Sequence, residues 1–84
     1  MNVYPNPATS EINIEVINEK QYLANEEYVV SVNNSFGQEI TQRVIPSGAR
    51  NLKIDTSQFP KGLCLVEVCT AERKVCHTQK VLIQ

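Results

Sequence analysis

The end of the chain decides the fold, and from Leu63 to Ile83 it reads LCLVEVCTAERKVCHTQKVLI. Two long apolar-rich runs, 63–70 and 75–83, flank the polar interval 71–74. Alternation of apolar and polar side chains within a run turns one face of a β-strand toward a core. A short polar interval between two such runs fits a tight hairpin. This stretch therefore predicts two long antiparallel strands that lie side by side.

The same period-two pattern recurs four times upstream, in runs rich in β-branched residues. The runs are Ile12–Val16, Tyr28–Asn33, Glu39–Val44 and Leu52–Asp55. In the third run, Ile40 and Val44 are expected on the face that packs on the core. Residues 18–27 contain helix formers without an apolar stripe, so a loop is expected there.

Turn residues and prolines separate these runs and indicate how they are joined. Gly37 is expected to take a positive φ in a hairpin turn, and Phe59 is a predicted plug at one end. Pro5 and Pro7 exclude a central strand, so residues 2–7 are predicted as a short edge segment. The fold class is therefore all-β: a small Ig-like antiparallel β-sandwich of about seven strands. The Trp of antibody domains is missing, so the pattern alone does not decide the superfamily.

The composition, 42% hydrophobic and 20% charged over 84 residues, is that of one globular domain spanning 1–84. No apolar run is long enough to span a membrane, and no signal peptide is visible. Either the protein is cytosolic, or the chain is a piece of a longer secreted precursor. The abrupt start at Met1, two residues before a Tyr-Pro-Asn-Pro motif, favours the precursor. Residues 1–42 carry a net charge of −5 and residues 43–84 of +4, but the bases are scattered singly. A nucleic-acid partner is not expected from such a pattern.

The three cysteines and the single histidine do not form a catalytic or metal-binding set in this pattern. Cys64 and Cys69 have opposite parity in one strand, so they face opposite sides of the sheet. Cys76 and His77 diverge in the same way. A shared tetrahedral metal site and a Cys–His nucleophile pair both fail on this geometry, and no cofactor is expected. Cys64 is expected to be a small buried hydrophobic residue.

The expected hairpin geometry suggests one disulfide bond, between Cys69 and Cys76, as a hypothesis. If the chain turns at Glu72-Arg73, Cys69 lies directly opposite Cys76. Opposed residues of antiparallel strands have Cβ atoms about 4.5–5.5 Å apart, close to what a disulfide requires. An oxidising, exported setting would permit the bond. The alternative is two neighbouring free thiols on an outer face, and the sequence leaves both open.

Four segments, in order along the whole chain, carry a family resemblance. They are Val3–Ala8 with its Tyr-Pro-Asn-Pro motif, Phe36–Glu39, Asp55–Leu63 and Gln79–Gln84. Together they resemble the C-terminal sorting domains of the type IX (Por) secretion system. One departure is Cys64, which stands where that family has an aromatic residue.

The resemblance implies a sorting signal at the C-terminus of a cargo protein that reaches the periplasm by a separate signal peptide. In that family the type IX translocon of the outer membrane recognises the folded module, and a sortase-like peptidase removes it. The cargo is then released into the medium or attached to lipopolysaccharide at the cell surface. By resemblance, recognition falls on the terminal motifs, that is, on Gly62, Lys80, Val81, Leu82 and Ile83.

Plainer roles remain open for these residues. Gly62 can serve only a turn, and Val81 and Ile83 can serve only the core. A final strand at a sheet edge would offer backbone groups to a receptor, but the sequence does not show whether that strand is an edge.

Three rival functions also remain open. An Ig-like adhesion or carbohydrate-binding module of a surface protein would need exposed aromatic residues on one face. A structural spacer between domains would need nothing beyond the fold. An enzyme is the least supported of the three.

Overall fold

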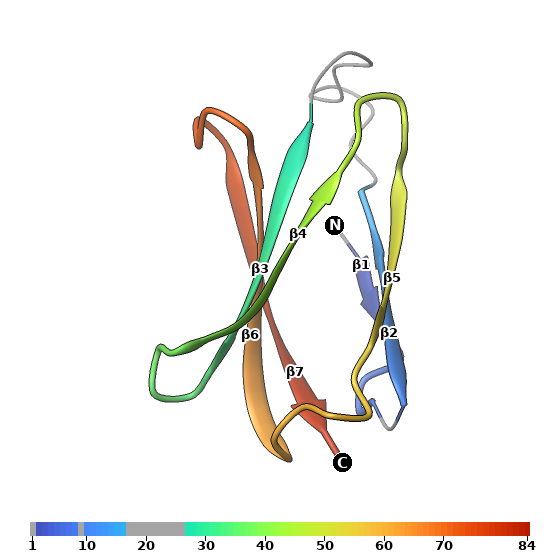
Figure 1. The fold of residues 1–84 in the computed structure, drawn as a ribbon, viewed down its shortest axis with the longest axis vertical. Coiled ribbons are helices and arrows are strands. Elements are labelled where there is room, and N and C mark those ends of the chain that lie inside the picture. The colour runs from blue at the N-terminus through green and yellow to red at the C-terminus, as the bar shows by residue number, and fades with distance from the viewer. Residues whose placement is uncertain (1, 9, 17–26) are drawn as a thin grey trace.

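A computed structural model describes residues 2–8, 10–16 and 27–84, and in this part of the chain seven strands form two antiparallel sheets (Figure 1). The strands are β1 (Asn2–Tyr4), β2 (Glu11–Glu15), β3 (Tyr28–Asn34), β4 (Glu39–Ile45), β5 (Asn51–Asp55), β6 (Gly62–Thr70) and β7 (Cys76–Ile83). One sheet has the order β1-β2-β5 and the other the order β4-β3-β6-β7. The predicted all-β sandwich is confirmed.

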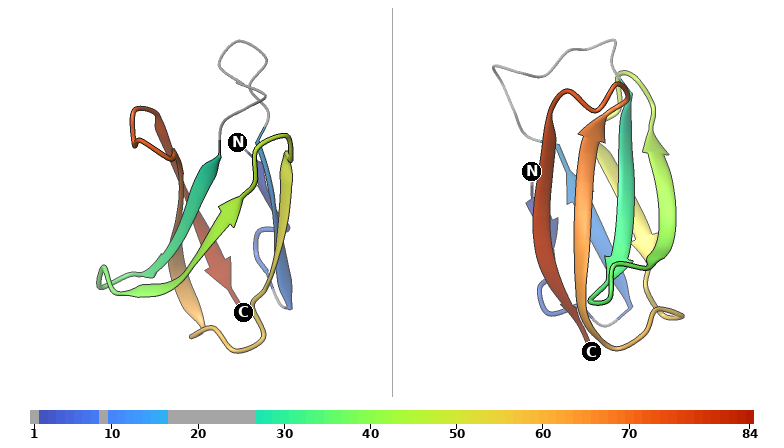
Figure 2. Two further views of the ribbon diagram at one scale, coloured as in Figure 1. Left: turned by 45° about the horizontal axis from the view of Figure 1, so that its top comes forward. Right: turned by 90° about the vertical axis from the view of Figure 1, so that its left-hand side faces the viewer.

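The strand order is that of an Ig-like sandwich. Strands β2 and β5 are far apart in the sequence but pair with each other, and so do β3 and β6. Between β4 and β5 the chain passes from the four-stranded sheet to the three-stranded sheet (Figure 2). In immunoglobulin-type domains the first, second and fifth strands likewise share a sheet that faces the third, sixth and seventh. Of the predicted edge segment 2–7, residues Asn2–Tyr4 form β1, which among the described strands pairs with β2 alone and so lies at the edge of its sheet.

The core lies between the sheets and is built from alternate residues of the strands. Its largest fully buried aliphatic side chains are those of Ile12, Ile14, Val30, Val32, Ile45, Val66 and Val81. Phe59 packs against this cluster, as predicted for a plug in the β5–β6 connection. Cys64 is also buried in the core, as its parity predicted. Period-two alternation therefore locates most of the core correctly.

The prediction for β4 is wrong in one respect. Val44 is 49% exposed and Ile45 is fully buried, the reverse of what alternation from Ile40 indicates. The pairing of β3 with β4 shifts between Val32 and Asn33, and Ile40 is the extra residue on β4. A bulge of one residue moves every later side chain of the strand to the opposite face.

Two further expectations concern a loop and a membrane span. The loop expected at 18–27 falls outside the described residues, apart from Glu27 just before β3. In the described part of the chain no helix has the length and apolar character needed to cross a bilayer.

Candidate functional site

The terminal strand lies at an edge of the four-stranded sheet. Strand β7 pairs along its length with β6, from Cys76 opposite Cys69 to Ile83 opposite Gly62. In the described part of the chain no strand of the sheet lies beyond it. Figure 2 shows β7 at the margin of this sheet, with the C-terminus at its end. The structure thus settles a point that the sequence left open.

The pleat of β7 divides the four terminal residues of the predicted site into two pairs. Val81 and Ile83 are 0% and 3% exposed and belong to the core. Lys80 and Leu82 point to the opposite face, where both are exposed. A partner that meets the folded domain can therefore contact the side chains of Lys80 and Leu82, whereas those of Val81 and Ile83 are out of reach.

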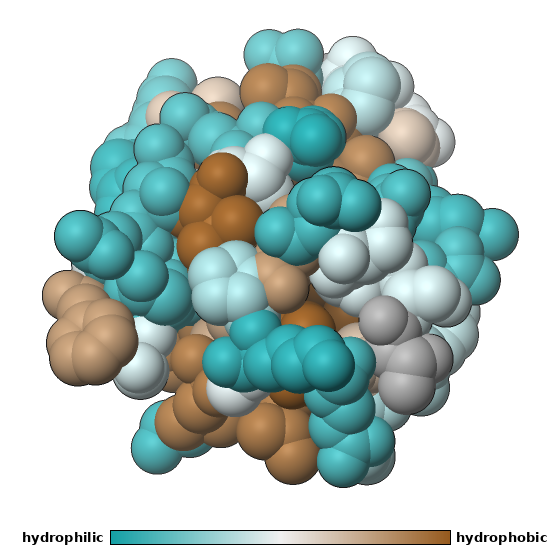
Figure 3. All heavy atoms as spheres, turned by 60° about the horizontal axis from the view of Figure 1, so that its bottom comes forward, coloured by the Kyte–Doolittle hydropathy of each residue, from teal (hydrophilic) through white to brown (hydrophobic). Residues whose placement is uncertain are grey.

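The exposed face around Leu82 is partly apolar. Leu63 lies directly opposite Leu82 on β6, and the two side chains are 44% and 41% exposed. The next outward residue along β6, Leu65, is half-buried and lies opposite Lys80. Seen from the end of the sandwich that carries the C-terminus, hydrophobic side chains alternate with polar ones over the surface (Figure 3). The terminal hairpin thus presents two leucines beside one ammonium group.

Gly62 begins β6 opposite Ile83, with φ at +124°. A Cβ atom at this position would meet nothing within 4 Å, so space does not require glycine here. The backbone conformation does, because L-residues with a side chain rarely adopt such a φ. Gly62 therefore sets the path by which the chain enters the terminal hairpin.

The N-terminal segment covers the outer edge of β7 near its end. The Asn6 side chain accepts a hydrogen bond from the Leu82 N–H (3.0 Å) and donates one to the Lys80 carbonyl (3.2 Å). Ala8 donates its N–H to the Leu82 carbonyl and accepts the N–H of Gln84, both at 2.8 Å. We call residues Asn6–Ala8 the clasp.

Sequence reasoning missed the clasp. Asn6 stands in the conspicuous Tyr-Pro-Asn-Pro motif, and an amide between two prolines cannot belong to a regular ladder. That was a usable signal that Asn6 has a special partner. Nothing in the linear sequence, however, indicates a partner 74–76 positions away.

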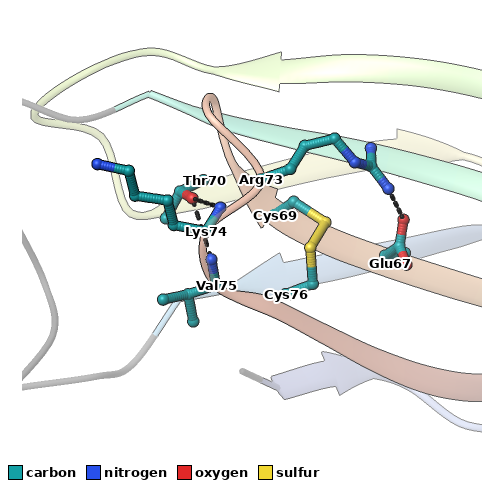
Figure 4. The surroundings of a disulfide bond; sticks show 7 residues. All are labelled: Glu67, Cys69, Thr70, Arg73, Lys74, Val75 and Cys76. Atoms are coloured by element: carbon teal, nitrogen blue, oxygen red, sulfur yellow. Dashed lines mark hydrogen bonds and ion pairs between the residues drawn. A yellow bond between two sulfur atoms is a disulfide. The ribbon is translucent and has the colours of Figure 1, made fainter.

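At its other end the hairpin is closed by a disulfide bond. The sulfur atoms of Cys69 and Cys76 are 2.07 Å apart, and the two residues are directly opposed (Figure 4). The Thr70 hydroxyl accepts the N–H groups of Lys74 and Val75 at 3.0 and 3.3 Å and so stabilises the turn.

Two other groups near the hairpin bear on its chemistry. The Glu67 carboxylate lies within 4.8 Å of both disulfide sulfurs, but sulfurs bonded to each other are not thiolate ligands for a metal. Cys64 faces the core, on the other side of the sheet, and burial raises the pKa of its thiol. It is therefore a poor nucleophile and cannot reach the disulfide.

A comparison with protein families identifies the chain. Residues 2–84 match the family described as secretion system C-terminal sorting domain. The chain belongs to this family. The match covers the whole described structure and confirms the resemblance to type IX sorting domains. No protein of curated function matches the sequence.

Membership of this family relates the arrangement of β7 to a sorting role. The sorting domain is a type IX secretion signal, and its family is not an enzyme family. Such a signal implies export to the cell surface or the medium. Its surface should therefore carry features that a protein partner can recognise, and the exposed residues of the terminal hairpin are candidates.

Proposed function

We propose that this sorting domain forms the C-terminal module of a longer precursor and directs the N-terminal cargo through the type IX outer-membrane translocon. In this proposal the cargo enters the periplasm by its own signal peptide, and the translocon binds the folded module. A sortase-like peptidase then removes the module at the outer membrane. Family membership supports the sorting role.

The observation that carries the proposal is the division of β7 into two faces. Lys80 and Leu82 are exposed, and they are offered to the translocon together with Leu63 across the hairpin. An apolar pair beside a cation fits a partner surface with a shallow apolar patch and a carboxylate nearby. Val81 and Ile83 contribute indirectly, by holding β7 in the sandwich, and Gly62 by shaping its entry.

Export of a fluorescent protein tests this proposal. The protein is targeted to the periplasm and fused to the sorting domain in a bacterium that has the type IX machinery. Variants L82S and K80A should each lower the exported fraction several-fold, because each removes one exposed contact. Their matched controls are V44S, with a similarly exposed apolar side chain on β4, and K53A, with an exposed lysine on β5. Both controls should be exported like the unmodified domain.

Two results would count against the proposal. If the folded, unmodified fusion stays in the periplasm, the domain is not a sufficient sorting signal. If L82S and K80A are exported as well as V44S and K53A, recognition lies elsewhere on the module. Shortening of the fusion at the start of the sorting domain during export would support the peptidase step, and its absence would restrict the proposal to sorting.

The carbohydrate-binding alternative receives no support from the described residues. Tyr4 and Phe36 are the exposed aromatic side chains among them. Tyr4 ends β1 in one sheet, whereas Phe36 lies in the β3–β4 hairpin of the other sheet, so they form no common stacking face. A glycan array probed with the isolated domain tests this alternative directly.

A further inference from the structure

The clasp completes the sheet edge at the end of β7 although it is not a regular strand. Pro5 and Pro7 have no N–H groups, so the backbone on either side of Asn6 cannot donate to β7. The Asn6 side chain replaces the missing backbone groups, since its amide donates and accepts as a peptide unit does. It forms hydrogen bonds with the carbonyl of Lys80 and the N–H of Leu82, two backbone groups on the edge of β7 that faces away from β6.

Ala8 extends this pairing by two further hydrogen bonds, to Leu82 and Gln84, and forms a parallel bridge with Ile83. Its side chain is fully buried, so the contact is packed as well as hydrogen-bonded. A third connection comes from Gln79, whose side-chain amide donates to the Val3 carbonyl at 3.2 Å. The last residues of the domain are therefore held on three sides: by the core, by the pairing with β6, and, at the outer edge, by the first residues of the domain.

The backbone atoms that Asn6 holds belong to Lys80 and Leu82, the two residues of the proposed recognition site on β7 whose side chains are exposed. An edge strand that is paired on one side only can fray, and its side chains then lose a fixed direction. With the clasp in place, the Lys80 carbonyl and the Leu82 N–H are each fixed by the same amide. The side chains of Lys80 and Leu82 consequently leave the surface at a defined place and angle.

We propose that Asn6 is a positioning residue for the terminal recognition segment. The Tyr-Pro-Asn-Pro motif and the end of β7 then act as one bipartite signal, in which the first motif orders the last. This inference rests on the proposed sorting function. Its structural part, that the clasp orders residues 80–84, can be tested without any export.

Amide hydrogen exchange on the whole 84-residue chain tests the structural part. In N6A both side-chain hydrogen bonds are lost, and each corresponds to about a fivefold change in the opening equilibrium. Exchange at Leu82 and Gln84 should therefore accelerate about 5- to 25-fold, while Val30 in the central strand β3 should stay within twofold. N6D keeps an acceptor for the Leu82 N–H but loses the donor to Lys80, so its exchange should fall between N6A and the unmodified chain. The control N51A removes an exposed asparagine side chain from β5 and should change none of these amides.

The fluorescent export assay tests the functional part with the same variants. Export should decrease in the order unmodified, N6D, N6A, and N51A should match the unmodified domain. Partial rescue by N6D separates positioning from mere stability if all variants show the same exchange at Val30. If Leu82 and Gln84 exchange normally in N6A, the clasp is overturned. If they exchange faster but N6A is exported normally, the positioning role is overturned and the clasp is structural only.

Failure of the proposed function gives a different pattern. In that case the unmodified fusion is not exported, and the bipartite signal falls with it. The exchange rates of N6A would still decide whether the clasp orders the end of β7.

Discussion

At the scale of single residues, the hydroxyl of Thr56 is a buried polar group without a hydrogen bond in the described part of the chain. Thr56 is 1% exposed, and its Oγ1 atom has no hydrogen-bond partner among the described residues. A buried hydroxyl without a partner costs about 1–3 kcal/mol. We expect T56V, which replaces the hydroxyl with a methyl group, to leave the free energy of unfolding unchanged or to raise it by up to about 2 kcal/mol. Urea denaturation measures this, with T56A as the control.

The control separates loss of the hydroxyl from loss of volume. T56A should be less stable than the unmodified domain by about 1–2 kcal/mol, because it leaves a small cavity. A T56V variant as unstable as T56A would show that the hydroxyl does have a partner in solution.

Asp55 gives the domain a dependence on pH. Its carboxylate accepts the backbone N–H of Ser57 at 2.8 Å, and this bond, followed by one from the Ser57 side chain, lowers the pKa of Asp55 below the ordinary 3.8. A carboxyl group with a lowered folded-state pKa stabilises the fold above its unfolded pKa, and this contribution disappears as pH falls through the folded pKa. D55N does not titrate. We therefore expect D55N to melt below the unmodified domain at neutral pH, with the difference shrinking below about pH 3.8.

Melting curves from about pH 7 to pH 2.5 measure this difference, and a carboxyl NMR titration of Asp55 gives the midpoint directly. The two proteins differ at residue 55 alone, so a change of this difference with pH reports on Asp55. A constant difference between the two melting temperatures over this range would contradict the assignment.

Alternation shows how far single residues can be predicted from the sequence. Cys64, Val81 and Ile83 are buried as their parity indicates, because the pleat of a strand alone decides their face. Val44 is not, because the bulge at Ile40 reverses the parity of the rest of β4. A bulge depends on how two strands pair, so the sequence of residues 39–45 alone does not predict it.

At the scale of elements, the β6–β7 hairpin is closed by the Cys69–Cys76 disulfide, which spans a sequence separation of 7. Closing so short a loop stabilises a fold by about 2–3 kcal/mol in the chain-entropy description. We expect the double variant C69A/C76A to lose about that amount in urea denaturation. The unmodified chain, unfolded without reductant, should show one reactive thiol, from Cys64. Three reactive thiols under those conditions would rule out the bond.

The β6–β7 hairpin could be predicted from the sequence, but the position of β7 at the edge of its sheet could not. A tight polar turn fixes the register of its two strands, so the opposition of Cys69 and Cys76 follows from the turn alone. Whether a strand lies beyond β7 depends instead on the order of the strands in the whole sandwich. The clasp is harder still to predict, because its pairing uses the side chain of Asn6 rather than a strand.

At the scale of the whole molecule, the two ends of the chain stabilise each other, and this affects how the signal can be tested. Removal of residues 79–84 would take Val81 and Ile83 out of the core and would expose the clasp. Large buried side chains contribute about 2–5 kcal/mol each, whereas a domain of this size has about 4–13 kcal/mol in total. We therefore expect the chain ending at Thr78 to lose its cooperative thermal transition.

Circular dichroism melting and the dispersion of amide NMR signals measure the loss. The matched comparison is the double variant K80A/L82S, which changes the exposed face of the same segment and should keep a cooperative transition within a few degrees of the unmodified domain. If the truncated chain melts like the unmodified one, the terminal residues are not part of the core in solution. If it unfolds as expected, failure of a truncated sorting domain to be exported cannot identify the recognised residues, and only substitutions on the exposed face of β7 can do so.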